Sequence, residues 1–189
     1  MEESKTRSSK RYFVALLPPD KVAEEVTEIK QFFDRTYNSH GALKSPPHIT
    51  LQPPFHWEAE RLTVLTESLA EFTQWHYPIP ITLSGFGAFP PRVIYVNVLK
   101  TPELMQVRAS LFTYLTQKFE SIATKADRRS FSPHMTVAFR DLKKHDFYDA
   151  WPQFQTRSLS REFTVSHLTL LVHDGRQWQV DRQFPFLAT

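Results

Sequence analysis

The sequence predicts one globular domain of mixed helices and strands, built as two similar lobes around a shared groove. The first observation is size, because 189 residues with 41% hydrophobic and 14% aromatic side chains can bury a substantial core. The second is patterning, since short apolar runs alternate with stretches whose apolar residues recur at helical spacing. The third is repetition: the order of elements in residues 11–90 recurs in residues 91–189, and each copy contains a Pro-His-x-Thr segment.

The first copy follows a polar segment, residues 1–10, which we expect to be a disordered tail. Its strands are short apolar runs ended by prolines or glycines, and its helices carry apolar residues three or four positions apart. In chain order we expect a strand at 12–17, a helix from Asp20, a strand at 48–52 closed by Pro53 and Pro54, a helix at 62–72 and a strand from Ile79 to about Gly85.

The second copy has a strand at 93–99, a helix from Pro102 to about Ser121, a strand at 134–140, a short helix at 147–151 and a hairpin of 163–172 with 178–184. Tyr12 and His48 are 36 residues apart, and Val93 and His134 are 41 apart, so the motif has a similar place in each copy. We infer a duplication with lobes at about 11–90 and 91–189. Because no flexible linker separates them, residues 11–189 should form a single domain.

Composition excludes several classes of function. The chain has no cysteine, which rules out thiolate catalysis, disulfides and cysteine-bound zinc. A net charge of +3 permits a phosphate-bearing partner without requiring one. We interpret the short basic clusters as solvated surface, except near Arg128 and Arg129, which precede the second motif. No apolar stretch has the length of a signal or membrane segment, so we expect a cytoplasmic protein without a membrane partner.

The paired Pro-His-x-Thr segments are the most specific feature of the sequence. Chance predicts about 0.7 His-x-Thr triplets and roughly 0.05 Pro-His-x-Thr segments in a chain of this composition. The chain contains three of the former and two of the latter, in SPPHITLQ from Ser45 and SPHMTVAF from Ser132. Both have Ser-Pro on the N-terminal side and an apolar residue between His and Thr, which indicates a shared function.

Strand geometry explains the spacing within each triplet. Side chains two positions apart point to one face of a strand, so His48 and Thr50 share a face, as do His134 and Thr136. The intervening apolar residues would anchor each strand in the core. Two such strands side by side would place two imidazoles and two hydroxyls around one phosphate. Imidazoles titrate near neutral pH and hydroxyls can donate to phosphate oxygens, which favours phosphoester chemistry.

Other histidines carry weaker signals. The third triplet, His167 to Thr169, lacks the proline and has no counterpart in the other copy, so we interpret it as a polar sheet face. Two histidines in one cleft could also bind zinc, but neither triplet has an accompanying carboxylate or thiolate, and threonine is a poor zinc ligand. We therefore expect no metal site. The remaining histidines show no pattern and are expected at the surface: His40, His76, His145 and His173.

Three stretches carry a family resemblance: the duplicated PHITL and PHMTV, the opening RYFVALLPP before a helix, and GFGAFPPRVIYVNV between the motifs. From about Arg11 to Phe186 the chain resembles the two-histidine (2H) phosphoesterase superfamily, in its bacterial branch of 2′-5′ RNA ligases and 2′,3′-cyclic phosphodiesterases. The resemblance implies an α+β fold with two antiparallel-sheet lobes and outer helices around a central groove. It also implies catalysis without a metal or another cofactor.

The implied activity is hydrolysis of a 2′,3′-cyclic phosphodiester of RNA type to a 2′-phosphate. His134 would act as general base on water and His48 as general acid to the leaving 3′ oxygen. Thr50 and Thr136 would bind the non-bridging phosphate oxygens. The reverse direction would join RNA ends through a 2′-5′ bond.

Substrate binding is expected to involve three further residues. Many relatives carry an arginine five residues after the second histidine, where this chain has Phe139. Arg140 comes one position later, and strand alternation from His134 would turn it toward the phosphate. Phe55 and Phe131 lie next to the two motifs in sequence, so either ring could stack on a base at the rim of the groove.

Two other classes of function remain open. The fold could serve as an RNA-binding or regulatory module without turnover, which alanine variants of both histidines would reveal by their effect on binding. It could instead hydrolyse a small cyclic nucleotide or an ADP-ribose cyclic phosphate, which the modest net charge would tolerate. The expected partners are thus RNA ends or small cyclic nucleotides, and we favour a monomer.

Overall fold

A computed structural model describes residues 9–119, 122 and 130–188. Residues 9 and 10 belong to the first strand, whereas the rest of the expected tail and the pair Arg128–Arg129 lie outside the described residues. The main elements are β1 (Ser9–Leu16), α1 (Asp20–Tyr37), η1 (Gly41–Lys44), β2 (Ile49–Glu58), α2 (Leu62–Thr73), β3 (Ile79–Phe89), β4 (Val93–Val98), α3 (Pro102–Lys118), β5 (His134–Ala138), α4 (Lys144–Gln155), β6 (Ser160–Val165), β7 (His167–His173) and β8 (Trp178–Pro185).

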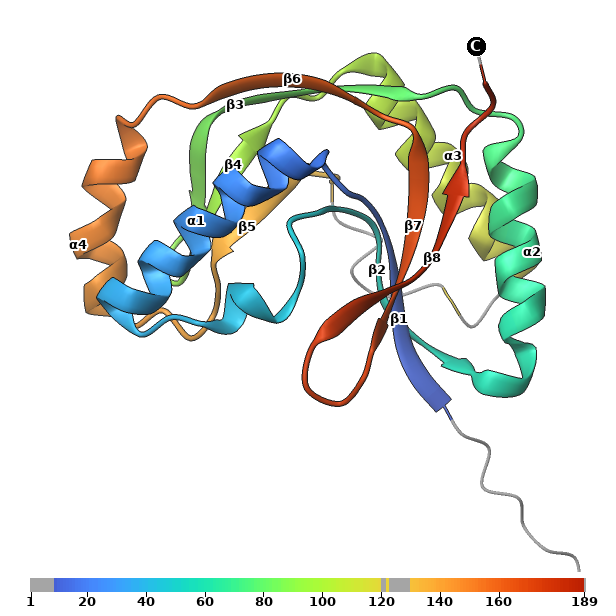
Figure 1. Cartoon of the computed structure of the whole chain (residues 1–189), viewed down its shortest axis with the longest axis horizontal. Helices are drawn as coiled ribbons and strands as arrows, with labels where there is room; N and C mark the ends of the chain where they lie inside the picture. Colours follow the sequence, from blue (N-terminus) through green and yellow to red (C-terminus); the bar gives the residue numbers. More distant parts are fainter. Residues whose placement is uncertain (1–8, 120–121, 123–129, 189) are drawn as a thin grey trace, which may run out of the picture.

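The strands form two antiparallel sheets of four strands, ordered β2-β1-β7-β8 and β5-β4-β3-β6. Helices lie on the outside of the molecule: α1 and α4 accompany the second sheet, whereas α2 and α3 lie near the first (Figure 1). The α+β fold with outer helices is therefore confirmed. Within the described residues, no helix is both long and apolar enough to cross a membrane.

The two copies exchange strands, so the predicted lobe boundary near residue 90 does not separate the two sheets. Strand β3 comes from the first copy but pairs with β4 and β6 of the second. Conversely, β7 comes from the second copy and pairs with β1 of the first. The expected single strand at 163–172 was wrong, because the chain leaves one sheet after Val165 and enters the other at His167. A pattern of alternating apolar residues shows that one face of a strand is buried, but it does not show which sheet the strand joins.

Strand β2 continues through Pro53 and Pro54 to Glu58, so the predicted end of this strand at Gln52 was wrong. The physical reason is its position at the edge of the sheet, where it pairs only with β1. An edge strand has one side without ladder bonds and can hold a residue that lacks an N–H. The pairing with β1 also shifts register between Tyr12 and Val14, opposite the prolines.

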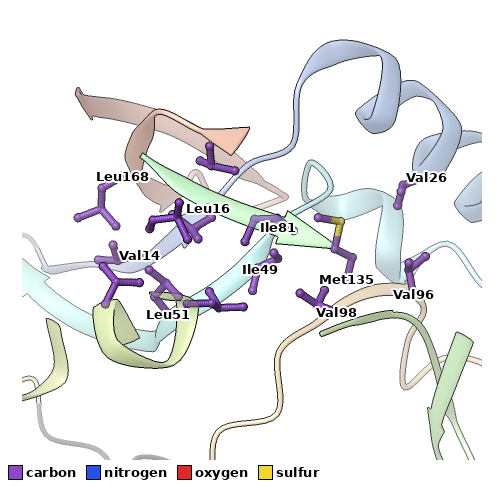
Figure 2. Packing of buried hydrophobic residues seen from close by; sticks show 14 of the residues in the cluster. Val14, Leu16, Val26, Ile49, Leu51, Ile81, Val96, Val98, Met135 and Leu168 are labelled. Carbon is purple, nitrogen blue, oxygen red and sulfur yellow. The ribbon is translucent and has the colours of Figure 1, made fainter. Parts of the chain in front are cut away.

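Both sheets contribute to one hydrophobic cluster beneath the motifs. Figure 2 shows Ile49 and Leu51 from β2 near Val98 and Met135 from the other sheet. Ile49, Leu51, Met135 and Val137 are at most 1% exposed. These are the residues that alternate with the motif residues along the two strands. Burial of their side chains therefore fixes the opposite face of each strand, which carries His and Thr.

Candidate active site

The two His-x-Thr triplets lie together on β2 and β5, which are the outer strands of their sheets and contact each other. His48 comes immediately before β2, and His134 begins β5. All four motif side chains line one cavity of about 220 Å³. The rest of its wall consists of Phe13, Gly41, Ala42, Ser45, Pro54, Phe139 and Trp178.

Each imidazole is oriented by a backbone carbonyl two residues earlier. The Nδ1 atom of His48 lies 2.7 Å from the carbonyl oxygen of Pro46, and that of His134 lies 2.7 Å from the carbonyl oxygen of Ser132. Because a carbonyl only accepts, Nδ1 carries the hydrogen and Nε2 is the basic atom of the neutral ring. A proline follows each carbonyl-bearing residue and restricts it to extended backbone. This explains the proline that precedes each motif histidine.

Aromatic rings support both imidazoles from the side. The Phe13 ring centroid lies 4.8 Å from that of His48, and Trp178 packs edge-on against Phe13. On the other strand, Tyr95 lies 5.0 Å from His134. Tyr95 sits opposite Gly87 in the β3–β4 ladder, where any Cβ on Gly87 would clash with its ring. The glycine therefore leaves room for the ring that supports His134.

The electrostatic surroundings keep both imidazoles neutral. Burial lowers the pKa of His48 to about 4 against the opposing hydrogen bond to Pro46, and the charges of Lys30 and His134 lower it further. Burial also lowers the pKa of His134, again against its backbone hydrogen bond. Lys30 is only 2% exposed, and burial lowers its pKa to about 7. Its ammonium donates to the carbonyl of Ser45, 2.9 Å away, in the cavity wall.

We predict that both histidines titrate below their ordinary value of 6.5 in the ligand-free protein, His48 near pH 4. Imidazole NMR signals followed against pH, and assigned with the His48→Ala and His134→Ala variants, measure this. Below pH 6.5 the His48 imidazole is protonated in the unfolded chain but stays neutral in the folded chain until about pH 4. The free energy of unfolding should therefore fall as pH drops from 6.5 toward 4. Inorganic phosphate should raise both midpoints, because a nearby anion favours the cation. A His48 midpoint above 6.5 without ligand would contradict this account.

The loop between α1 and β2 forms one wall of the cavity and is bound to the other sheet by Asp141. Its carboxylate accepts from the Ser39 hydroxyl at 3.0 Å and from the Gly41 backbone N–H at 2.7 Å. A Cβ at Gly41 would lie 2.8 Å from a carboxylate oxygen of Asp141, so a larger residue here would force that side chain to shift. Asp141 follows β5, which means that one side chain fixes the first motif's loop relative to the second motif's strand.

Sequence comparison identifies the family. A model of the 2′-5′ RNA ligase superfamily matches residues 18–177, which include both triplets. The chain belongs to this superfamily. A relative from Geobacillus kaustophilus, provisionally named a phosphoesterase, is 28% identical over 178 residues, covering 92% of this chain and 95% of its own.

Solved structures share the fold of this superfamily member. The TT0787 protein of Thermus thermophilus superimposes with a TM-score of 0.69 at 18% identity, covering 93% of this chain and 97% of that protein. Escherichia coli LigT in complex with 3′-AMP gives a TM-score of 0.67 at 17% identity, covering 96% and 100%.

Two of the expected substrate-binding residues do not line the cavity. Phe55 was expected at the groove rim, but it is 3% exposed and packs near Tyr12 and Trp57 in the core, because β2 continues past the prolines. Arg140 was expected to reach the phosphate by strand alternation, but β5 ends at Ala138 and Arg140 is exposed. Its guanidinium lies 5.5 Å from the Phe139 ring, and Phe139 itself lines the cavity.

The remaining candidate residues lie outside the cavity wall. Phe131 lines a groove next to the cavity. His167 lies in a separate depression beside Leu17 and Gln183, and its Nδ1 is 2.8 Å from the Ser166 hydroxyl. In the part of the chain that the structure describes, no group of three or more His, Asp or Glu side chains could hold a metal ion. The four histidines without a pattern are also absent from the cavity wall: His40, His76, His145 and His173.

Several residues in or behind the cavity wall were not predicted from the sequence. Phe13 and Trp178 come from strands that we assigned only to the core or to the last hairpin. The signal for Phe13 was an apolar run without alternation, which implies that both faces of β1 are covered. The position of Lys30, one residue after Ile29 at the edge of the apolar stripe of α1, could have indicated that this lysine is buried.

Proposed function

We propose that this cavity hydrolyses the 2′,3′-cyclic phosphodiester at an RNA-type end and releases a 2′-phosphate. The observation that carries the proposal is the convergence of two histidines and two threonine hydroxyls on one cavity of about 220 Å³. The Nδ1 hydrogen bonds leave one basic Nε2 on each ring. Membership of the 2′-5′ RNA ligase superfamily and the 3′-AMP complex of LigT are consistent with a nucleotide-type ligand.

In the proposed reaction the two histidines have opposite roles. His134 accepts a proton from water through Nε2 while the water oxygen bonds to phosphorus. The bond from phosphorus to the 3′ oxygen breaks, and protonated His48 gives its proton to that oxygen. Thr50 and Thr136 donate hydrogen bonds to the non-bridging oxygens as their charge grows. Burial makes the His48 cation unfavourable in the empty cavity, and the bound phosphate supplies the negative charge that raises its pKa.

The same chemistry accommodates the joining of two RNA ends. A 5′-hydroxyl in place of water would attack the cyclic phosphate and leave a 2′-5′ bond. The proton transfers between the histidines and the two oxygens are then the same. The balance between hydrolysis and joining would depend on whether the attacking position holds water or a strand end.

Product analysis tests the proposal. The purified chain is incubated with 2′,3′-cyclic mononucleotides, short oligonucleotides with cyclic ends and an ADP-ribose cyclic phosphate, and products are identified by phosphorus NMR. We expect 2′-phosphates from the RNA-type substrates. A 3′-phosphate product would contradict the proposed bond cleavage. Binding without turnover would instead support an RNA-binding module, and turnover confined to the ADP-ribose compound would support a small-ligand enzyme.

We also predict that turnover persists in excess EDTA. Neither triplet is accompanied by the carboxylates that usually hold Mg²⁺, and the proposed proton transfers use imidazoles alone. The rate of cyclic phosphate hydrolysis is measured before and after chelation, with a divalent-ion-dependent nuclease as a control for the chelator. Loss of activity that one divalent ion restores would refute the prediction.

A further inference from the structure

A second, larger groove of about 790 Å³ opens beside the cavity. Thr50 and His134 line both spaces, so the groove begins at the motif residues themselves. It runs past the connection between β4 and α3, past α3, and past the segment before β5. The other described residues in its wall are Leu51, Pro53, Phe89, Lys100, Arg108, Ser130, Phe131 and Ser132.

The chemical character of this groove differs from that of the cavity. Lys100 and Arg108 contribute basic side chains, and among the described residues that line the groove none is acidic. Phe131 is partly exposed, and the Arg108 guanidinium lies 5.6 Å from its ring centroid. Basic side chains that follow a backbone, together with an accessible aromatic ring, are the usual means of binding single-stranded nucleic acid.

The volumes of the cavity and the groove suggest which part of a ligand each of them would hold. Ligand sites usually measure roughly 300–1,000 Å³. The cavity, at about 220 Å³, falls below that range, whereas the groove, at about 790 Å³, falls within it. A cyclic phosphate and its ribose placed against both histidines would therefore leave the remaining part of a longer ligand in the groove.

We propose that this groove binds the nucleotide that precedes the cyclic end of a single RNA strand. Lys100 and Arg108 bind the backbone phosphate of that nucleotide, and Phe131 stacks on its base. The inference rests on the proposed function and makes its substrate more specific: a strand end in preference to a free cyclic mononucleotide. Sequence preference should be weak, because phosphate contacts and stacking do not read base edges.

The test compares two substrates with the same reacting end, a 2′,3′-cyclic mononucleotide and a short oligonucleotide that ends in it. We expect Lys100→Gln and Arg108→Gln each to lower kcat/KM for the oligonucleotide about tenfold, the usual scale for losing a hydrogen bond to a charged group. Both should leave mononucleotide kinetics unchanged. The slope of log kcat/KM against log salt should become shallower by about 0.7 per lost phosphate contact. Glutamine retains much of the Arg108 side chain that packs near Phe112.

Lys144→Gln is the matched control, because Lys144 is an exposed lysine on α4 and does not line the groove. Equal losses on both substrates, or no wild-type preference for the oligonucleotide, would overturn the inference. If no cyclic phosphate is hydrolysed at all, the proposed function is refuted, and the groove has to be tested by binding alone. The groove is then tested by fluorescence anisotropy with a labelled 3′-phosphorylated oligonucleotide. Weaker binding by Lys100→Gln and Arg108→Gln than by Lys144→Gln supports the groove, and equal binding refutes it.

Discussion

Replacing either motif histidine with alanine is expected to lower kcat for cyclic phosphate hydrolysis by about 10²–10⁴-fold. His48→Ala removes the group that gives a proton to the leaving 3′ oxygen, and His134→Ala removes the group that takes one from water. Alanine removes the whole ring, and the Nδ1 of the remaining histidine is occupied by a backbone carbonyl, so no nitrogen replaces the lost Nε2. Steady-state rates on a 2′,3′-cyclic mononucleotide measure the effect for each variant.

His167→Ala is the matched control for these variants. His167 also begins a His-x-Thr triplet on a strand, but it lines a separate depression. Its replacement should leave kcat unchanged. All three variants should retain the fold, because His48, His134 and His167 are only partly buried. The assignment of the active site fails if His167→Ala abolishes turnover while His48→Ala does not.

Replacing Thr50 or Thr136 with valine should lower kcat by about 10²–10³-fold, the range measured for single oxyanion donors elsewhere. Valine keeps the branched shape and β-strand preference of threonine and removes only the hydroxyl. The loss should appear in kcat more than in KM, because the hydrogen bonds strengthen as negative charge grows on the phosphate oxygens. Rates and KM values on the same cyclic mononucleotide separate the two effects.

Thr169→Val provides the corresponding control. Thr169 belongs to the third triplet and is fully buried, 3.5 Å from the Gln183 side chain. Its loss affects the stability of the β7–β8 pair and should leave kcat of the folded enzyme intact. An increase in KM without a change in kcat for Thr50→Val would show that this hydroxyl binds the ground state alone, contrary to the proposed role.

Local pattern was sufficient to locate the motif side chains. Alternation along β2 and β5 placed Ile49 and Met135 in the core and the histidines and threonines on the opposite face, and the structure has this arrangement. The repetition of the motif indicated that both copies share one cavity. These features depend on a few adjacent residues and on the period of a strand, which the sequence displays directly.

Long-range partners could not be predicted in the same way. Ser166 is the single residue at which the chain passes from one sheet to the other, and nothing in its identity indicates that change. Phe55 illustrates a local failure, because two prolines normally end a strand and here occupy an edge. Arg140 shows the limit of the alternation argument, which holds only as far as the strand extends, because β5 stops at Ala138. Its part in substrate binding stays a prediction.

The exchange of β3 and β7 between the sheets bears on the ancestry of the chain. A polypeptide with only one copy would complete neither sheet, since β3 of the first copy lies beside β4, the first strand of the second, and β7 of the second copy lies beside β1, the first strand of the first. Two such polypeptides could each contribute a strand to the other's sheet across a two-fold axis, as domain-swapped homodimers do. The histidines of identical subunits would then have met at the axis. Gene fusion would have made one chain of that dimer and freed each histidine to specialise.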